Sequence, residues 1–143
     1  MVLNEYGNIV SAFWDDLPSH YPNIKTDECV VMPNHVHGII VIDNNAGNGL
    51  KPFPTQHGLS EIMRGFKTFS SRKINEIISS ETKFQWQKSF YDHVIRNEKS
   101  LNCVREYITI NPARWDLDIE NRNVGNGLKP FPTTRDYYSQ IFD

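Results

Sequence analysis

The chain is poor in cysteine and contains no long hydrophobic run. Its two cysteines, Cys29 and Cys103, have no CxxC spacing, and the disulfide framework of a small secreted domain needs more of them. No segment resembles a signal peptide, and apolar runs such as Gly38–Ile42 are far shorter than the ~20 residues of a membrane-spanning helix. We therefore expect a reducing, cytoplasmic environment and no membrane partner.

A net positive charge, which is typical of nucleic-acid-binding proteins, is also missing, because the formal net charge is -2. The charges are unevenly distributed, however. Residues 1–45 carry one basic side chain against six acidic ones, whereas residues 61–114 carry ten Lys or Arg against six acidic residues. If the chain contacts phosphates, it should do so through this basic middle part. A set of solvated helix faces would give the same distribution.

The length of 143 residues suits one compact domain. Apolar residues at helical spacing predict helices over 8–20, 59–79 and 97–111, the last with Asn97 as its N-cap and Pro112 as its stop. Segments rich in Val and Ile predict two strands, 27–32 and 35–43, that form an antiparallel hairpin around Pro33-Asn34, and a third strand over 84–95. Loop is expected over 44–57 and from residue 116 onward.

One peptide occurs twice. The nine residues Gly47–Thr55, GNGLKPFPT, recur letter for letter as Gly125–Thr133. Repeats of solenoid proteins are longer, ~20–50 residues, and the flanking residues do not match here. We interpret the copies as one short genomic repeat that is read in frame at two places.

The first candidate for a metal-binding or catalytic group is His35-Val36-His37. Side chains two apart on a strand share a face, so two imidazoles ~7 Å apart along the backbone can converge on one metal ion. A histidine pair of no consequence at a sheet edge would have the same spacing.

The second group is Tyr107 and Asn111, four residues apart on the last predicted helix and hence on one face. Tyr107 could be a core residue and Asn111 a cap. Together with the two histidines they fit one scheme, in which two imidazoles and an amide oxygen are neutral ligands of a divalent ion. Tyr107 would attack a phosphorus atom held there. Mg²⁺ and Mn²⁺ suit phosphate chemistry, and Mn²⁺ tolerates imidazole better.

Four segments closely resemble the REP-associated tyrosine transposases, which belong to the single-tyrosine HUH transposase superfamily. The resemblance covers residues 1–118 in order, and the combination of segments is highly specific. They are VVMPNHVHGII at Val30–Ile40, FKTFSSRKI at Phe66–Ile74, WQKSFYDHVIRN at Trp86–Asn97 and REYITINPARW at Arg105–Trp115.

The resemblance implies an α+β fold, with an antiparallel sheet flanked by helices as in HUH or ferredoxin-like nucleases, over residues 1–118. Residues 119–143 would form a tail that carries the second nonapeptide. The implied activity is metal-dependent cutting and rejoining of single-stranded DNA near hairpins, with His35, His37 and Asn111 as metal ligands and Tyr107 as nucleophile. Tyr91 and His93 are weaker candidates for the same site.

Four basic residues could follow a DNA backbone. Lys67, Arg72 and Lys73 lie in the segment that resembles the basic helix of the family, and Arg96 lies in the segment Trp86–Asn97. Each of these side chains could equally be ordinary solvated surface. Binding through them would weaken steeply as the salt concentration rises.

Relatives usually carry more chain before the segment that begins here at Met1, including a strand of the sheet. We therefore expect this chain to lack the first strand of the family, which would leave an open sheet edge. A homodimer could cover that edge, or Met1 could differ from the true start of the gene. The main alternative function is a truncated, catalytically inactive DNA-binding remnant, and a cupin-like metalloenzyme is disfavoured because the chain is predicted to be helical after residue 58.

Overall fold

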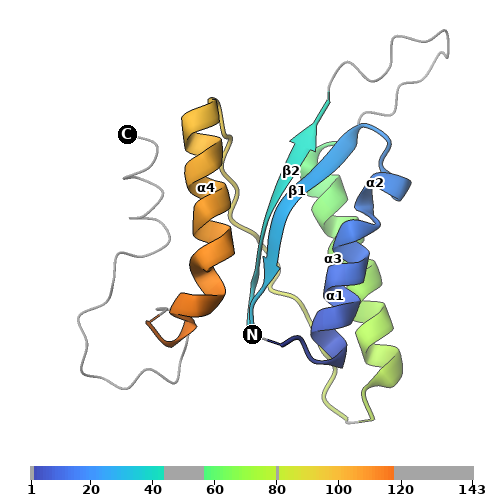
Figure 1. The fold of residues 1–143 in the computed structure, drawn as a ribbon. Helices are drawn as coiled ribbons and strands as arrows, with labels where there is room; N and C mark the ends of the chain where they lie inside the picture. Colours follow the sequence, from blue (N-terminus) through green and yellow to red (C-terminus); the bar gives the residue numbers. More distant parts are fainter. Residues whose placement is uncertain (1, 44–56, 80, 118–143) are drawn as a thin grey trace, which may run out of the picture. The chain divides into compact units, whose positions relative to one another are not determined.

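The computed structural model describes residues 2–43, 57–79 and 81–117, so the repeated nonapeptide and the predicted tail lie outside the described residues. Within them the chain divides into two compact units. The first contains residues 28–37 and 91–117, and the second contains residues 2–27 and 38–90. The elements in chain order are α1 (Glu5–Asp15), α2 (Leu17–His20), β1 (Ile24–Val31), β2 (Val36–Ile42), α3 (Leu59–Ile77), α4 (Glu98–Ile110) and the 3₁₀ helix η1 (Asn111–Leu117) (Figure 1).

Strands β1 and β2 form an antiparallel hairpin that contributes to both units. The backbone N–H of Met32 donates to the His35 carbonyl over 2.8 Å, which closes the turn at Pro33-Asn34. At the opposite end, Asp43 N–H donates to the Asn23 carbonyl, also over 2.8 Å. The hairpin and its helices confirm the predicted α+β class with an antiparallel sheet.

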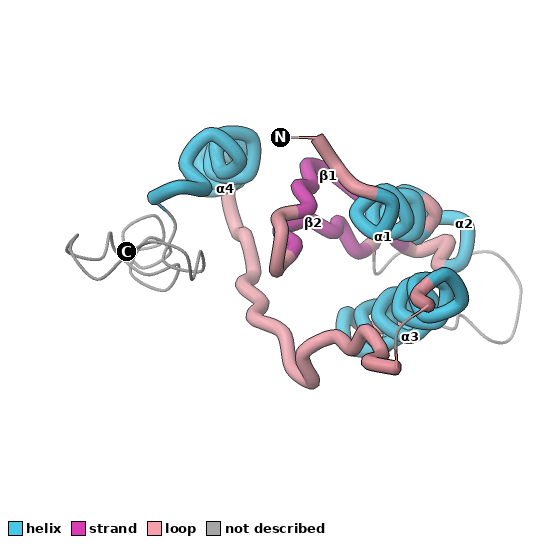
Figure 2. Tube along the Cα trace, turned by 90° about the horizontal axis from the view of Figure 1, so that it is seen from below, coloured by secondary structure: helices cyan, strands magenta, loops and turns pink. Residues whose placement is uncertain are grey.

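Helices α1 and α3 of the second unit run side by side (Figure 2). The Trp14 indole of α1 meets the Phe66 ring of α3 edge-on, with centroids 5.6 Å apart, and Ile62 and Ile74 of α3 are fully buried. Trp14 also covers Gly38 of β2 so closely that a Cβ atom at Gly38 would overlap its ring. The core of this unit therefore forms where two amphipathic helices meet the second strand.

The first predicted helix differs from the observed one. Helix α1 begins earlier, because the Asn4 side chain accepts a hydrogen bond from Gly7 N–H over 2.9 Å and caps it. The helix ends at Asp15, and Pro18 stands in the first turn of the separate helix α2. Proline is well tolerated in a first turn, where its missing N–H has no partner to lose.

The predicted third strand, 84–95, is wrong, since residues 83–97 contain no strand or helix. Side chains of α3 bind this segment instead of a neighbouring strand. The Asn75 amide both donates to the Phe84 carbonyl and accepts from the Phe84 N–H, at 2.9 and 2.7 Å. The Lys67 ammonium donates to the carbonyls of Gln87 and Ser89, each over 2.8 Å. Side chains of α3 thus satisfy backbone groups of Phe84, Gln87 and Ser89 that a neighbouring strand could have paired.

Helix α4 of the first unit begins as predicted, because the Asn97 side chain accepts from Ser100 N–H over 2.8 Å and acts as its N-cap. Val104 and Ile108 form its buried stripe, and η1 follows it directly. No helix in the described parts of the chain is both long and apolar enough to cross a membrane.

Candidate metal and nucleophile site

The hairpin of the first unit brings the two predicted histidine ligands together. His35 ends the turn, His37 is the second residue of β2, and their Nε2 atoms lie 3.0 Å apart. Two nitrogens bound at right angles to one ion at ~2.1 Å each lie ~3.0 Å apart. The observed spacing therefore fits two ligands of a single metal ion.

The orientation of the His35 ring is fixed by its neighbour Asn34. The Nδ1 atom of His35 lies 2.6 Å from the Oδ1 atom of Asn34. An amide oxygen can only accept, so Nδ1 carries the proton, and in the neutral ring the lone pair is left on Nε2. Metal-binding histidines commonly donate their second ring nitrogen in this way.

Helix α4 places Tyr107 beside the histidines. The Tyr107 ring meets the His37 ring edge-on, with centroids 5.3 Å apart and an angle of 75° between the planes. Both residues are half-buried. The predicted nucleophile therefore lies in contact with one predicted metal ligand, in the same unit.

Asn111 lies one helical turn after Tyr107. Its backbone continues the helical conformation, with φ −55° and ψ −46°, and its N–H donates to the Tyr107 carbonyl. The side chain is buried, with 3% of its surface exposed, and its Oδ1 atom has no hydrogen-bond partner within the described structure. A buried acceptor without a partner is costly, and a metal ion is one group that would satisfy it. The residues present therefore fit a divalent ion.

Sequence reasoning did not single out Trp115. Its ring in η1 lies 6.1 Å from the His35 ring, measured between centroids, at an angle of 43°. The spacing of four residues that joins Tyr107 to Asn111 also joins Asn111 to Trp115, and this spacing could have identified it. A half-buried indole at the site offers an apolar surface against which a nucleotide base could stack.

The two weaker candidates, Tyr91 and His93, belong to the irregular segment before α4 and are exposed. Among residues 2–43, 57–79 and 81–117, no cluster of three or more His, Cys, Asp or Glu side chains could hold a metal ion. The assignment of the third ligand therefore depends on the amide of Asn111.

The four predicted DNA-binding residues are dispersed. Lys67, Arg72 and Lys73 lie on α3 in the second unit, whereas Arg96 is exposed in the first unit. The Arg72 guanidinium lies 5.6 Å from the centre of the Phe69 ring, and Lys73 is paired with Glu76 at 2.9 Å. Lys67 is already held by two carbonyls, and its partial burial lowers the pKa of its ammonium group below the ordinary value.

Comparison with known proteins identifies relatives of this chain. The model of a family described as "Transposase IS200 like" matches residues 19–111, which is more than half of the chain. An uncharacterized protein of Haemophilus influenzae is 37% identical over 132 residues, covering 82% of this chain and 71% of the relative. A second protein of that organism, named "Putative REP-associated tyrosine transposase", is 22% identical over 116 residues, covering 78% of this chain and 62% of the relative.

No solved structure matches the chain significantly. The family match includes both histidines of the hairpin, Tyr107 and Asn111. Because it extends over most of the described residues of both units, the chain belongs to the IS200-like transposase family.

Proposed function

We propose that the chain is a metal-dependent endonuclease and strand transferase, which cuts and rejoins single-stranded DNA near hairpins. Membership of a transposase family makes DNA the partner and DNA cleavage the general activity. The observation that supports the finer proposal is the arrangement of His35, His37 and Tyr107. Two imidazole nitrogens converge within 3.0 Å, and a phenol ring contacts the second of them.

His35, His37 and Asn111 would hold the divalent ion, Mg²⁺ or Mn²⁺, through two imidazole nitrogens and one amide oxygen. Bound there, the ion would supply Lewis-acid polarisation of a phosphate oxygen. All three ligands are neutral, so they leave the positive charge of the ion available for a phosphate. The buried, unpartnered Oδ1 of Asn111 supports its place in this set.

Tyr107 would act as the nucleophile. Its phenol oxygen forms a bond to the phosphorus as the bond from phosphorus to the 3′ oxygen breaks. The phenol proton is lost to solvent, and the released 3′ oxygen takes up a proton. The products are a 5′-phosphotyrosine and a free 3′-hydroxyl. Since the pKa of a phenol is ~10, the phenolate is a tolerable leaving group, and a 3′-hydroxyl of another DNA end can reverse the step.

The contact between His37 and Tyr107 would position the nucleophile for this reaction. An edge-on ring pair restricts the rotation of both side chains, so the phenol is held beside the predicted metal ligands before DNA arrives. Pre-positioning of a nucleophile reduces the entropic part of the barrier. Helix α4, capped by Asn97 and followed directly by η1, supplies the rigid support.

The test is covalent capture. The full chain is incubated with a hairpin-tailed single strand of DNA and Mn²⁺, and the protein–DNA adduct is measured on a denaturing gel. Wild-type protein should give the adduct, excess chelator should prevent it, and Tyr107→Phe should abolish it. Tyr91→Phe is the matched comparison, because Tyr91 is the weaker candidate for the nucleophile and its side chain is exposed. This variant should retain the adduct.

An adduct that persists in Tyr107→Phe would contradict the nucleophile assignment. Hairpin binding without an adduct under any metal condition is the result expected of the alternative, a catalytically inactive DNA-binding remnant. Both outcomes can be read from the same protein preparation, because binding is measured before the sample is denatured.

A further inference from the structure

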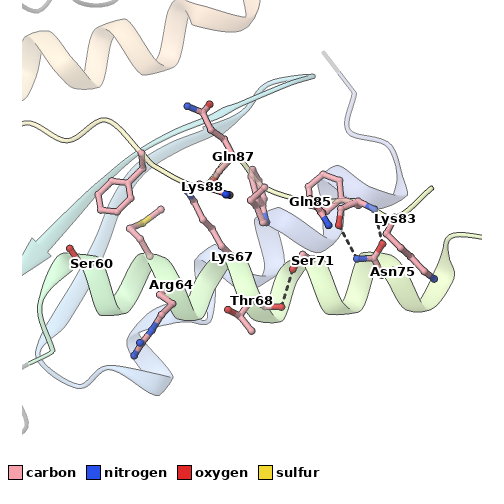
Figure 3. Close-up of a pocket in the computed structure, with 14 residues that line it drawn as sticks. Ser60, Arg64, Lys67, Thr68, Ser71, Asn75, Lys83, Gln85, Gln87 and Lys88 are labelled. Carbon is pink, nitrogen blue, oxygen red and sulfur yellow. Dashed lines mark hydrogen bonds between the residues drawn. The ribbon is translucent and has the colours of Figure 1, made fainter. Parts of the chain in front are cut away.

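A groove of about 740 Å³ lies between α3 and the irregular segment 83–90 of the second unit. One wall carries Arg64 and Lys67 of α3, and the other carries Lys83 and Lys88 (Figure 3). The groove belongs wholly to the unit that does not contain His35, His37 and Tyr107. None of these three residues lines it.

Hydrogen bonds hold the wall formed by segment 83–90. The Asn75 amide donates to the carbonyl of Phe84 and accepts from its N–H. The Trp86 indole donates to the Ser70 hydroxyl over 2.9 Å. The Lys67 ammonium donates to the carbonyls of Gln87 and Ser89. A wall fixed at three points does not need to be ordered when a ligand binds, and this lowers the cost of binding.

The groove is basic although the chain as a whole is acidic. Four Lys or Arg side chains line it and no Asp or Glu does, against a net charge of -2 for the chain. Lys67 is engaged with its two carbonyls. In the parts of the chain that the structure describes, Arg64, Lys83 and Lys88 are exposed and form no ion pair. Three cations are therefore available to an anionic ligand.

The same groove carries flat and amide side chains. Phe84, Trp86 and Phe90 line it and are half-buried, while Gln85 and Gln87 are exposed at its edge. Sites for single-stranded nucleic acids typically combine basic side chains that follow the phosphate backbone with aromatic rings on which the bases stack. The rings of Phe84 and Trp86 pack edge-on against each other, and their remaining exposed surface suits a nucleotide base. An acidic peptide would use the cations but not this surface.

We propose that the groove between α3 and segment 83–90 binds single-stranded DNA, with Arg64, Lys83 and Lys88 at the phosphates and the aromatic wall beside the bases. The nature of the ligand rests on the proposed function, since that function makes single-stranded DNA the substrate. The site itself concerns binding and not cleavage. It also differs from the residues predicted from the sequence, because Arg72 and Lys73 do not line the groove.

The experiment measures binding without chemistry. The full chain carrying Tyr107→Phe is titrated with a fluorescent oligothymidine in chelator, and the dissociation constant is followed by anisotropy at several salt concentrations. Lys83→Ala with Lys88→Ala is compared with Lys25→Ala with Lys99→Ala. The control pair changes the charge by the same amount at exposed lysines that do not line the groove.

The groove pair should weaken binding by about tenfold at low salt and reduce the slope of log affinity against log salt by ~1.4, because two phosphate contacts are lost at ~0.7 each. The control pair should change affinity by less than about twofold. Equal losses in the two pairs, or no loss in the groove pair, would overturn the proposal. Thermal unfolding of each variant verifies that the fold is retained.

A second comparison separates DNA from other polyanions. Oligothymidine should bind more tightly than an abasic oligomer of the same length or a polyglutamate peptide. Equal affinity for either would overturn the assignment to single-stranded DNA. Failure of the adduct assay with wild-type protein would contradict the proposed chemistry and leave these binding results unchanged, so the two proposals can fail independently.

Discussion

The Nδ1 atom of His35 lies 2.6 Å from the amide oxygen of Asn34, while its Nε2 atom lies 3.0 Å from Nε2 of His37. Since Asn34 Oδ1 can only accept, a neutral His35 presents a lone pair to His37, and His37 must donate its Nε2 proton. Binding of a metal ion would displace that proton. The lone pair of His35 Nε2 is thus ready for a metal ion before the ion binds, because the hydrogen bond to Asn34 keeps the proton on Nδ1.

Asn34→Ala should therefore weaken Mn²⁺ binding by about tenfold, which is the lower end of the effect of second-shell partners of metal-binding histidines. The cause is loss of the hydrogen bond that fixes the His35 proton on Nδ1. Asn34→Asp keeps an acceptor and should retain the affinity. Free Mn²⁺ measured by electron paramagnetic resonance gives the affinity, and ¹⁵N chemical shifts of His35 report its tautomer. Unchanged affinity and tautomer in Asn34→Ala would contradict this role.

Asn111→Leu should separate metal binding from stability. The buried Oδ1 has no partner, so replacing the amide by an apolar side chain of similar size should leave the metal-free protein as stable or more stable by ~1 kcal/mol. Mn²⁺ affinity should nevertheless fall, because one ligand is removed. Thermal unfolding with and without Mn²⁺ measures both quantities. A large loss of stability in the metal-free variant would show that Asn111 acts as a structural cap instead.

Periodicity predicted the elements that have strong local signals. Asn97 as an N-cap and the Val/Ile-rich hairpin around Pro33-Asn34 were correct because a cap and a turn depend on a few adjacent residues. The predicted third strand was wrong because the structure of segment 84–95 depends on the element that its backbone bonds to, and that element is distant in sequence. No local rule shows that Asn75, 9 residues before Phe84, will take the place of a neighbouring strand.

The side-chain geometry at the candidate site was predictable to a similar extent, while the roles of its residues stay predictions. The spacing within each pair predicted that His35 and His37 share one face of a strand, and that Tyr107 and Asn111 share one face of a helix. The structure brings His37 and Tyr107 into contact. The hydrogen bond from His35 to Asn34 was not predictable, since it depends on side-chain rotamers. The helical spacing could have suggested Trp115 as a neighbour of the site, but not the distance of its ring from His35. Lys67 illustrates the same limit. A basic residue on a basic helix suggests phosphate binding, whereas its actual partners are carbonyls 20 and 22 residues away.

Gly38→Ala should destabilise the protein by roughly 1–3 kcal/mol, the usual cost of overpacking. An added Cβ would overlap the Trp14 ring, which is part of the core and cannot move without disturbing Phe66. Gly58→Ala is the control. Its Cβ would meet nothing within 4 Å, and only the weaker capping of α3 by alanine should be seen, below ~1 kcal/mol. Urea unfolding measures both variants, and equal losses would contradict the packing argument.

Lys67→Met tests whether this lysine serves the fold. The change keeps much of the apolar stem but removes the ammonium that joins α3 to the carbonyls of Gln87 and Ser89. Hydrogen bonds from charged donors contribute ~1.5–3 kcal/mol each when their partners are buried, and exposure of this segment reduces that, so we expect a loss of about 1–2 kcal/mol in urea unfolding. Loss of DNA affinity with unchanged stability would instead assign Lys67 to phosphate binding.

The same lysine should give the stability a pH dependence. Burial lowers the pKa of the Lys67 ammonium in the folded chain, whereas the unfolded chain keeps the ordinary value of ~10.4. Between these two values the unfolded state binds more protons than the folded state, so the free energy of unfolding rises with pH. The stability of wild type relative to Lys67→Met should therefore increase as the pH is raised through that window. Parallel urea titrations of the two proteins at successive alkaline pH values measure the difference, and a difference that stays constant or falls would contradict the direction of the shift.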